Sequence, residues 1–287
     1  MEMRSHKTQR AGLVQLCCGR DPDANWQVAS ALVREAAAAG ATYAQTPENT
    51  SLMEADRERL FAFARAEAET NVFAMRCAVL AAELKIHLHI GSIAVAVGPE
   101  KLANRSLLFS PAGALIGQYD KIHMFDVDLP SGESYRESRN FQGGNLAIVA
   151  DLPPAKLGMT VCYDLRFPAL YRSLAEKGAG ILSVPSAFTR TTGEAHWHVL
   201  LRARAIETGS FVLAAAQSGR HENGRETFGK SLIIGPWGEV IAEAPDGPGF
   251  IVADIDIAEV ETARVRTPAL QHARPFARPE TAIRKSA

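Results

Sequence analysis

Three residues far apart in the sequence, Glu48, Lys121 and Cys162, carry the side chains needed to attack a carbonyl carbon. Cys162 lies in the segment KLGMTVCYDLRFP, residues 156–168, where an apolar strand ends and a helix is expected to begin. This strand–turn–helix arrangement presents a nucleophile at a sharp corner. A helix N-terminus favours the thiolate, and ionising a free thiol of pKa about 8.5 at about pH 7 costs roughly 2 kcal/mol. On this segment alone, a buried structural cysteine is the alternative.

Lys121 and Glu48 are each predicted to follow directly on a strand, which would fix their positions. A lysine beside a nucleophile can hold a thiolate and stabilise a developing oxyanion. Glu48 follows the rigid Pro47. A glutamate in an apolar pocket gains basicity and can accept a thiol proton. Taken alone, each residue is equally compatible with an ordinary solvated side chain, so only the combination of the three predicts catalysis.

Short apolar runs alternate with helical patterns along the chain, and these elements must position the three residues. Asp21 or Asp23 is suited to cap the first helix, and Gly40 to end it. Strands are predicted at residues 11–18, 43–46, 86–95, 157–161, 181–184, 211–216, 231–234, 239–242 and 250–254. Helices are predicted at residues 21–39, 71–85, 166–177 and 194–208.

Hairpin signals are mixed with these strand–helix units. Ser110-Pro111-Ala112-Gly113 joins two apolar runs within residues 105–119, and residues 129–145 read as a long, functional loop. The pattern predicts sheets covered by helices, of α/β or α+β type. We expect one domain over residues 1–287, with a proline-bearing C-terminal tail from about residue 267 that crosses the surface or a partner subunit.

Composition narrows the class of partner and the compartment. The 287 residues are 47% hydrophobic and 22% charged, with a formal net charge of −1. This balance gives no reason to expect nucleic acid or an anionic membrane as partner. The four cysteines have no CxxC spacing, and neither a secretory signal nor a membrane-spanning apolar run is evident. We therefore expect a reduced, cytoplasmic protein.

Glu48, Lys121 and Cys162, in that order and each at a strand end, resemble the nitrilase superfamily of carbon-nitrogen hydrolases. The resemblance extends from the first strand to about Gln271, and the segment CYDLRFP is its most specific part. It implies a four-layer α-β-β-α sandwich. It also implies a homodimer or higher homo-oligomer, joined through the helices expected at residues 166–177 and 194–208.

The resemblance also assigns roles to residues. Glu48 matches the general base, Lys121 the oxyanion-stabilising lysine and Cys162 the nucleophile. Glu137 matches a second glutamate that positions the lysine and the substrate. The backbone N–H of Tyr163 is expected to complete the oxyanion hole.

The same resemblance suggests a rim for the substrate. Ser186 and Phe188 are candidate substrate-binding residues. Arg166 either holds a substrate carboxylate or forms a structural ion pair. The implied reaction is hydrolysis of a small amide through a Cys162 thioester, with no metal or organic cofactor.

Within the superfamily, the run AAAQSGRH of residues 214–221 is similar to the Nit branch, which contains deaminated glutathione amidases and ω-amidases that act on α-ketoglutaramate. Deaminated glutathione is the preferred substrate expectation. Other short aliphatic amides, nitriles and N-carbamoyl compounds stay open as alternatives. One departure is His198, which stands where the family usually has glutamate and leaves substrate preference open.

Other classes remain to be tested. They are a catalytically silent binding protein on the same scaffold and a peroxide-sensing thiol protein. A Cys-His dyad using His123 or His196 would be a different mechanism. A metal site at His196 and His198 is disfavoured because residues i and i+2 of a helix point to different faces. Asp126 and Asp128 could be metal ligands, although loop capping fits them better.

Overall fold

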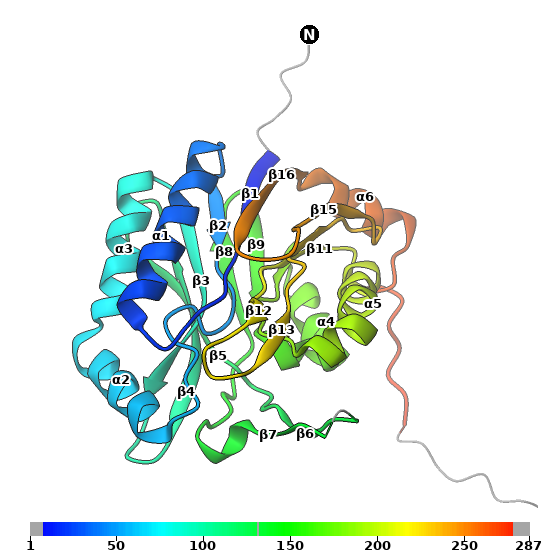
Figure 1. Cartoon of the computed structure of the whole chain (residues 1–287). Helices are drawn as coiled ribbons and strands as arrows, with labels where there is room; N and C mark the ends of the chain where they lie inside the picture. The colour runs from blue at the N-terminus through cyan, green and yellow to red at the C-terminus, as the bar shows by residue number, and fades with distance from the viewer. Residues whose placement is uncertain (1–7, 131, 278–287) are drawn as a thin grey trace, which may run out of the picture.

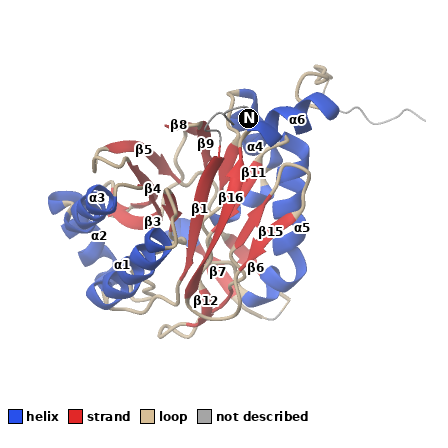
Figure 2. Cartoon of the chain, turned by 90° about the horizontal axis from the view of Figure 1, so that it is seen from above, coloured by secondary structure: helices blue, strands red, loops and turns tan. Residues whose placement is uncertain are grey.

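The computed structural model describes residues 8–130 and 132–277, which form two sheets packed face to face with helices on both outer sides. Figure 2, seen from above, shows the order of layers: helices, sheet, sheet, helices. The predicted four-layer α-β-β-α sandwich is therefore confirmed.

The first six-stranded sheet has the order β16-β1-β2-β3-β4-β5. Its centre is parallel, because β1 pairs with β2 and β2 with β3 in the same direction, and its outer strands are antiparallel. The strands are β1 (Thr8–Gln15), β2 (Tyr43–Gln45), β3 (His87–Ala96), β4 (Leu102–Phe109), β5 (Leu115–Asp120) and β16 (Gly249–Asp256).

The second sheet has the order β15-β14-β11-β10-β9-β8 and repeats this plan. Three parallel strands, β9, β10 and β11, lie at its centre between antiparallel neighbours. The strands are β8 (Ile148–Leu152), β9 (Ala155–Met159), β10 (Ile181–Ser183), β11 (Phe211–Ala214), β14 (Leu232–Ile234) and β15 (Val240–Glu243).

Three helices cover each sheet. On the first sheet lie α1 (Pro22–Ala38), α2 (Arg57–Thr70) and α3 (Val72–Leu84); on the second lie α4 (Pro168–Glu176), α5 (Arg190–Thr208) and α6 (Ala258–Arg266). Asp21, Asp56 and Thr189 accept hydrogen bonds from the first-turn N–H groups of α1, α2 and α5, which fixes where these helices begin.

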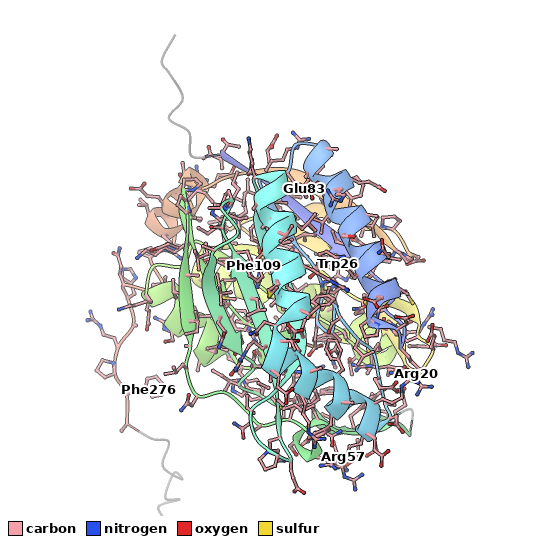
Figure 3. All side chains as sticks on the ribbon, turned by 90° about the vertical axis from the view of Figure 1, so that its left-hand side faces the viewer. Arg20, Trp26, Arg57, Glu83, Phe109 and Phe276 are labelled. Carbon is pink, nitrogen blue, oxygen red and sulfur yellow. The ribbon has the colours of Figure 1, made fainter. Side chains whose placement is uncertain are left out.

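Apolar side chains fill the spaces between the layers. The larger core joins the facing sides of the two sheets, with Leu13 and Tyr43 from one sheet and Leu182 and Leu213 from the other. A second core lies between the first sheet and its helices, where the rings of Trp26 on α1 and Phe73 on α3 meet edge to face. Figure 3 shows Trp26 on the inner side of α1, beside α3.

Several short elements differ from the sequence prediction. The helices α2 and α6 were not predicted, and the helix after Cys162 begins at Pro168 because a short 3₁₀ turn, η2 (Cys162–Arg166), comes first. The segment predicted as a loop at residues 129–145 contains β7 (Ser134–Arg136) and a 3₁₀ turn, η1 (Glu137–Arg139); β7 pairs with β6 (Asp126–Asp128). A further hairpin joins β12 (Ser218–Arg220) and β13 (Glu226–Phe228).

The tail extends along the outside of the molecule as far as residue 277, with the Phe276 side chain 91% exposed (Figure 3). The tail beyond residue 277 lies outside the described residues. In residues 8–130 and 132–277, no helix combines the length and apolar character needed to cross a lipid bilayer.

Candidate active site

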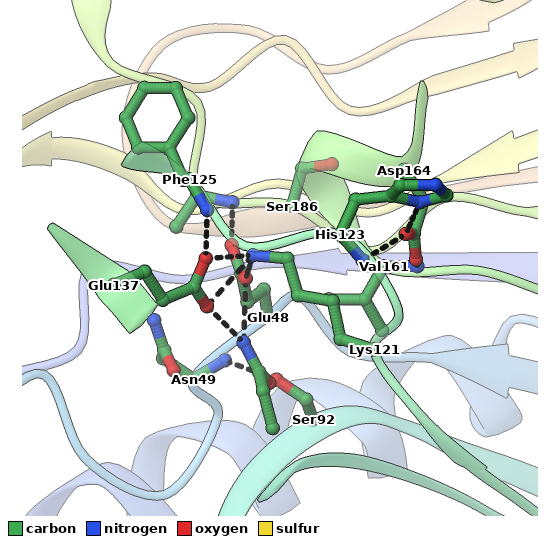
Figure 4. Close-up of polar contacts among 12 residues, drawn as sticks. Glu48, Asn49, Ser92, Lys121, His123, Phe125, Glu137, Val161, Asp164 and Ser186 are labelled. Carbon is green, nitrogen blue, oxygen red and sulfur yellow. Dashed lines mark hydrogen bonds and ion pairs between the residues drawn. The ribbon is translucent and has the colours of Figure 1, made fainter. Parts of the chain in front are cut away.

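Glu48, Lys121 and Cys162 meet in one cavity of about 540 Å³, together with Glu137. Glu48 comes after β2, Lys121 directly after β5 and Cys162 after β9, so both sheets deliver residues to the same place. The Lys121 Nζ lies 2.9 Å from Glu48 Oε1 and 2.8 Å from Glu137 Oε2 (Figure 4). The predicted convergence of the three side chains is present in the structure.

The backbone at Cys162 presents the thiol. Its φ of 51° is in the left-handed region, and its N–H donates to the Pro185 carbonyl oxygen at 2.9 Å. Burial raises the pKa of the Cys162 thiol, and the negative charge of Glu48 raises it further; Lys121 opposes both with a smaller effect. The resting group is therefore a thiol. The α-helix expected shortly after Cys162 begins only at Pro168, because the 3₁₀ turn η2 comes first.

Glu48 is placed to receive the thiol proton, because its carboxylate hydrogen-bonds the Cys162 side chain. Its Oε2 accepts the Ala187 N–H at 3.0 Å. Burial alone would raise the pKa of Glu48, but the charge of Lys121 and the hydrogen bonds to Cys162 and Lys121 outweigh it and lower this pKa. Glu48 is consequently an ionised base beside a neutral thiol, which is the protonation pattern that general-base attack requires.

Lys121 lies between two carboxylates. Burial would lower the pKa of its ammonium, but Glu137 and Glu48 more than compensate and raise that pKa, so Lys121 stays charged. Glu137 accepts from Lys121 with both oxygens, at 2.9 and 2.8 Å, and its Oε2 also accepts the Phe125 N–H at 2.6 Å. The cation is thus held in a fixed position at the floor of the cavity.

Asn104, on β4, is a functional residue that the sequence prediction missed. Its Nδ2 donates to Glu48 Oε1 at 2.9 Å and to Glu137 Oε1 at 3.2 Å, and its backbone oxygen accepts the Lys121 N–H at 3.0 Å. It therefore ties all three charged groups together. In the sequence Asn104 is one polar residue within an apolar strand, and its inward direction can be recognised only once the register with β5 is known.

Asp164, in the turn after the nucleophile, holds that turn to the segment that carries Lys121. Its carboxylate accepts the Tyr119 hydroxyl at 2.7 Å and the Val161 N–H at 2.9 Å, and it is 2.7 Å from His123 Nδ1. The aspartate is fully buried. One carboxylate thus fixes the strand end before Cys162 and the strand end before Lys121 relative to each other. Figure 4 shows Asp164 beside His123.

Comparisons with known proteins agree with this geometry. A family model described as carbon-nitrogen hydrolase matches residues 10–265. The chain belongs to the carbon-nitrogen hydrolase family. It is therefore a hydrolase of carbon–nitrogen bonds other than peptide bonds. Proteins named deaminated glutathione amidase are similar to it: one from Yersinia enterocolitica is 38% identical, covering 93% of this chain and 94% of the relative, and one from Homo sapiens is 38% identical, covering 89% and 79%.

Solved structures of the family superpose well. The C. elegans NitFhit protein matches with a TM-score of 0.87 and 32% identity, covering 93% of this chain and 65% of that protein, so this chain spans about two thirds of its length. An amidase from Nesterenkonia sp. AN1, whose active-site cysteine carries the product of acrylamide addition, matches with a TM-score of 0.76 and 25% identity, covering 90% and 97%.

Of the other residues that were predicted to contact the substrate, some line the cavity and some do not. Tyr163 and Phe188 line it. Ser186 does not; it is fully buried, and its hydroxyl donates to the Val184 carbonyl oxygen at 3.0 Å. Arg166 also lies outside the lining, where its guanidinium carbon is 5.9 Å from the centre of the Tyr163 ring and 5.6 Å from that of Phe188.

The histidines occupy structural positions in this family member. His123 stacks on Phe167 with ring centres 3.5 Å apart and does not line the cavity, and His196 is 3.2 Å from an Arg166 nitrogen, so neither forms a dyad with Cys162. His198 is 3.2 Å from Glu243 at the surface. The described residues contain no group of three or more potential metal ligands.

Asp126 and Asp128, the first and last residues of β6, bind nearby residues of this chain through their side chains. Asp126 accepts the Ser138 N–H at 2.9 Å, and Asp128 pairs with Arg136 at 2.8 Å. The four cysteines are all free.

Proposed function

We propose that the chain hydrolyses the amide of deaminated glutathione through a thioester on Cys162. The observation that carries this proposal is the convergence of Glu48, Lys121 and Cys162 on one cavity, where Lys121 Nζ lies 2.9 Å from Glu48 Oε1 and the charge of Glu48 acts on the Cys162 thiol. The relatives of similar length that bear the name deaminated glutathione amidase support the choice of substrate. A cavity of about 540 Å³ falls within the usual range for small-molecule sites of about 300–1,000 Å³.

The first half of the reaction forms the thioester. Glu48 takes the proton of the Cys162 thiol as sulfur attacks the amide carbon, which keeps the unfavourable free thiolate from accumulating. Lys121 Nζ and the Tyr163 N–H stabilise the oxygen of the tetrahedral intermediate. Glu48 then returns the proton to the leaving nitrogen, and the carbon–nitrogen bond breaks.

The second half releases the acid. Glu48, ionised again, accepts a proton from water as the water attacks the thioester carbon. The second tetrahedral intermediate rests on Lys121 and collapses to the acid, and the proton on Glu48 returns to the Cys162 sulfur. Throughout both halves Glu137 and Asn104 act as positioning residues, because they keep the Lys121 ammonium and the Glu48 carboxylate at fixed distances.

A second candidate is ω-amidase activity on α-ketoglutaramate, which shares the acyl group and differs in the leaving group. Deaminated glutathione loses the dipeptide Cys-Gly, which leaves through its amino group, whereas α-ketoglutaramate loses ammonia. The size of the cavity favours the larger substrate. Other short amides, nitriles and N-carbamoyl compounds would use the same attack geometry, and the assay below ranks them.

The test measures α-ketoglutarate release from both α-keto substrates, with the Cys162→Ala variant as control. We expect the wild-type protein to release it from deaminated glutathione with the higher kcat/KM, and intact-protein mass spectrometry of a rapidly quenched reaction to find the acyl group on Cys162. Folded wild-type protein that turns over neither substrate would refute the proposal and favour a silent binding protein. A sulfenic acid on Cys162 without turnover would favour a peroxide sensor.

We further infer a homodimer in the cytoplasm. Val199 and Ile206, seven residues apart on the outer face of α5, are 68% and 55% exposed, and Trp237, whose neighbour Gly238 lies against Ile206, is 61% exposed. An apolar surface of this kind is typical of an association site. The four free cysteines fit a reducing compartment. Light scattering should give twice the chain mass, and Ile206→Glu should lower it; a wild-type monomer would contradict the inference.

A further inference from the structure

Arg225 lines the same cavity and has no assigned role in the mechanism above. It stands immediately before β13, at the end of the turn that joins β12 and β13. Its Nη2 donates to the Ala187 carbonyl oxygen, and its guanidinium carbon lies 5.3 Å from the centre of the Tyr135 ring. The guanidinium is therefore held from two sides, by a peptide and by an aromatic face.

Arg225 has no direct ionic partner. Among the described residues no carboxylate forms an ion pair with it, although its charge helps to lower the pKa of Glu48 at longer range, and its Nε is buried without a hydrogen-bond partner. A guanidinium has five N–H donors, and the described residues accept only one of them from Arg225. The side chain is half-buried, and a buried donor without an acceptor is unfavourable, so a ligand that supplies acceptors would complete the group.

The other charged side chains around the cavity already have partners. Glu54 pairs with Arg20 at 2.9 Å, and Glu133 accepts the Tyr135 hydroxyl at 3.1 Å. The remaining pairs are Lys121 with Glu48 and Glu137, and Arg136 with Asp128. Arg225 is thus the cation of this set that an incoming anion can bind without breaking an existing ion pair.

Arg166, the residue that the sequence suggested as a carboxylate ligand, is engaged elsewhere. It lies outside the cavity lining, over the Tyr163 and Phe188 rings, and it contacts His196. The structure instead assigns that function to Arg225, which reaches the cavity itself. The two arginines consequently form a matched pair for an experiment, because only one of them faces the substrate.

We propose that Arg225 binds the carboxylate at the far end of the acyl group and so determines the preference for amides that carry one. The inference rests on the proposed function and deepens it. Its geometric basis is the Ala187 peptide, whose N–H donates to Glu48 and whose carbonyl accepts from Arg225. A single residue therefore separates the base from the cation, which matches a short acyl chain with the reacting amide at Glu48 and the carboxylate at Arg225.

Two amides of equal chain length test this assignment. Glutaramate carries a terminal carboxylate where valeramide carries a methyl group, so the ratio of their kcat/KM values isolates recognition of the carboxylate. Charge-assisted hydrogen bonds predict that Arg225→Gln lowers this ratio by about 10- to 100-fold. Arg225→Lys should lower the ratio less, because the positive charge remains although a lysine cannot donate two parallel hydrogen bonds to the carboxylate. Arg166→Gln should change both substrates by the same factor and preserve the ratio.

The ratio also separates recognition from a merely structural role. Losing the bond to Ala187 could displace Glu48, but that would slow both amides equally. An unchanged ratio in Arg225→Gln would overturn the proposal, and a collapse of the ratio in Arg166→Gln would move the function back to Arg166.

A binding measurement keeps the test independent of turnover. Glutarate should bind the Cys162→Ala protein in calorimetry, and adding Arg225→Gln should weaken that binding by the same factor of about 10 to 100. Glutarate binding without hydrolysis in the wild-type protein would refute the proposed reaction and support the Arg225 site. Hydrolysis of amides with glutarate binding that is unaffected by Arg225→Gln would refute the site alone.

Discussion

Asn104 offers the sharpest test of how the charged cluster is held together. Replacing it with leucine keeps a side chain of similar size and removes the donor that bridges Glu48 and Glu137. Two hydrogen bonds to charged groups are worth about 1.5–3 kcal/mol each, or about 3–6 kcal/mol together. The Asn104 Oδ1 is buried without a partner, and removing it returns about 1–3 kcal/mol. The expected net loss in the free energy of unfolding of Asn104→Leu is therefore about 2–3 kcal/mol.

The loss should depend on pH in a definite direction. The folded-state pKa of Glu48 is lowered, so its contribution to stability is present above the unfolded value of about 4.3 and is lost as pH falls through the folded pKa. Without Asn104 that folded pKa rises. The difference between variant and wild type should consequently be largest near neutral pH and shrink below about pH 4.

Urea unfolding at several pH values, together with kcat/KM, measures both effects. The control is Asn140→Leu, because Asn140 lines the same cavity but its side chain only accepts from Arg57 at an exposed position. The control should change stability by less than about 0.5 kcal/mol. An Asn104→Leu protein as stable as the control, with unchanged kcat/KM, would show that the bridge contributes nothing and would refute the reasoning.

Three further outcomes follow from the site. Lys121→Met should lower kcat by about 10²–10³-fold, since a major oxyanion partner is lost. It should also raise the pKa of the Glu48 carboxyl, so that the stability contributed by Glu48 is lost at a higher pH than in the wild-type protein. Gly91→Ala should destabilise by about 1–3 kcal/mol, because a Cβ there would collide with backbone oxygens just before Glu48, whereas Gly98→Ala, which meets open space, should be neutral. Ultraviolet thiolate absorbance at Cys162, taken as wild type minus Cys162→Ala, should stay absent from about pH 7 to about pH 9, and a thiolate at about pH 7 would contradict the raised pKa.

The sequence predicts the inner strands of the second sheet well because they are buried on both faces. The strands β11 and β14 are continuous apolar runs, and the pattern locates them within a few residues. The helices α2 and α6 escaped prediction because their exposed faces are highly charged and their buried residues are few. In both, contact with the rest of the protein decides the structure more than an apolar stripe does.

The residues of the site also fall into a group that the sequence located and a group that it missed. Glu48, Lys121 and Cys162 were found because they stand at strand ends, where the sequence marks the boundary. Asn104 and Arg225 were missed because their roles depend on strand register and on a turn between distant segments, neither of which local spacing encodes. The direction of the pKa shift of Cys162 also depends on its surroundings after folding, because burial and the charge of Glu48 both raise it.

The left-handed backbone at Cys162 has a consequence for how this protein can evolve. A φ of 51° is strained for a residue with a Cβ and unstrained for glycine, and asparagine tolerates it better than most. Selection for folding alone would thus favour glycine or asparagine at this position, whereas the proposed reaction requires the sulfur of cysteine. In lineages that abandon catalysis while retaining the scaffold, this position should be among the first to drift, and its replacement should leave a descendant that is inert and more stable than its ancestor.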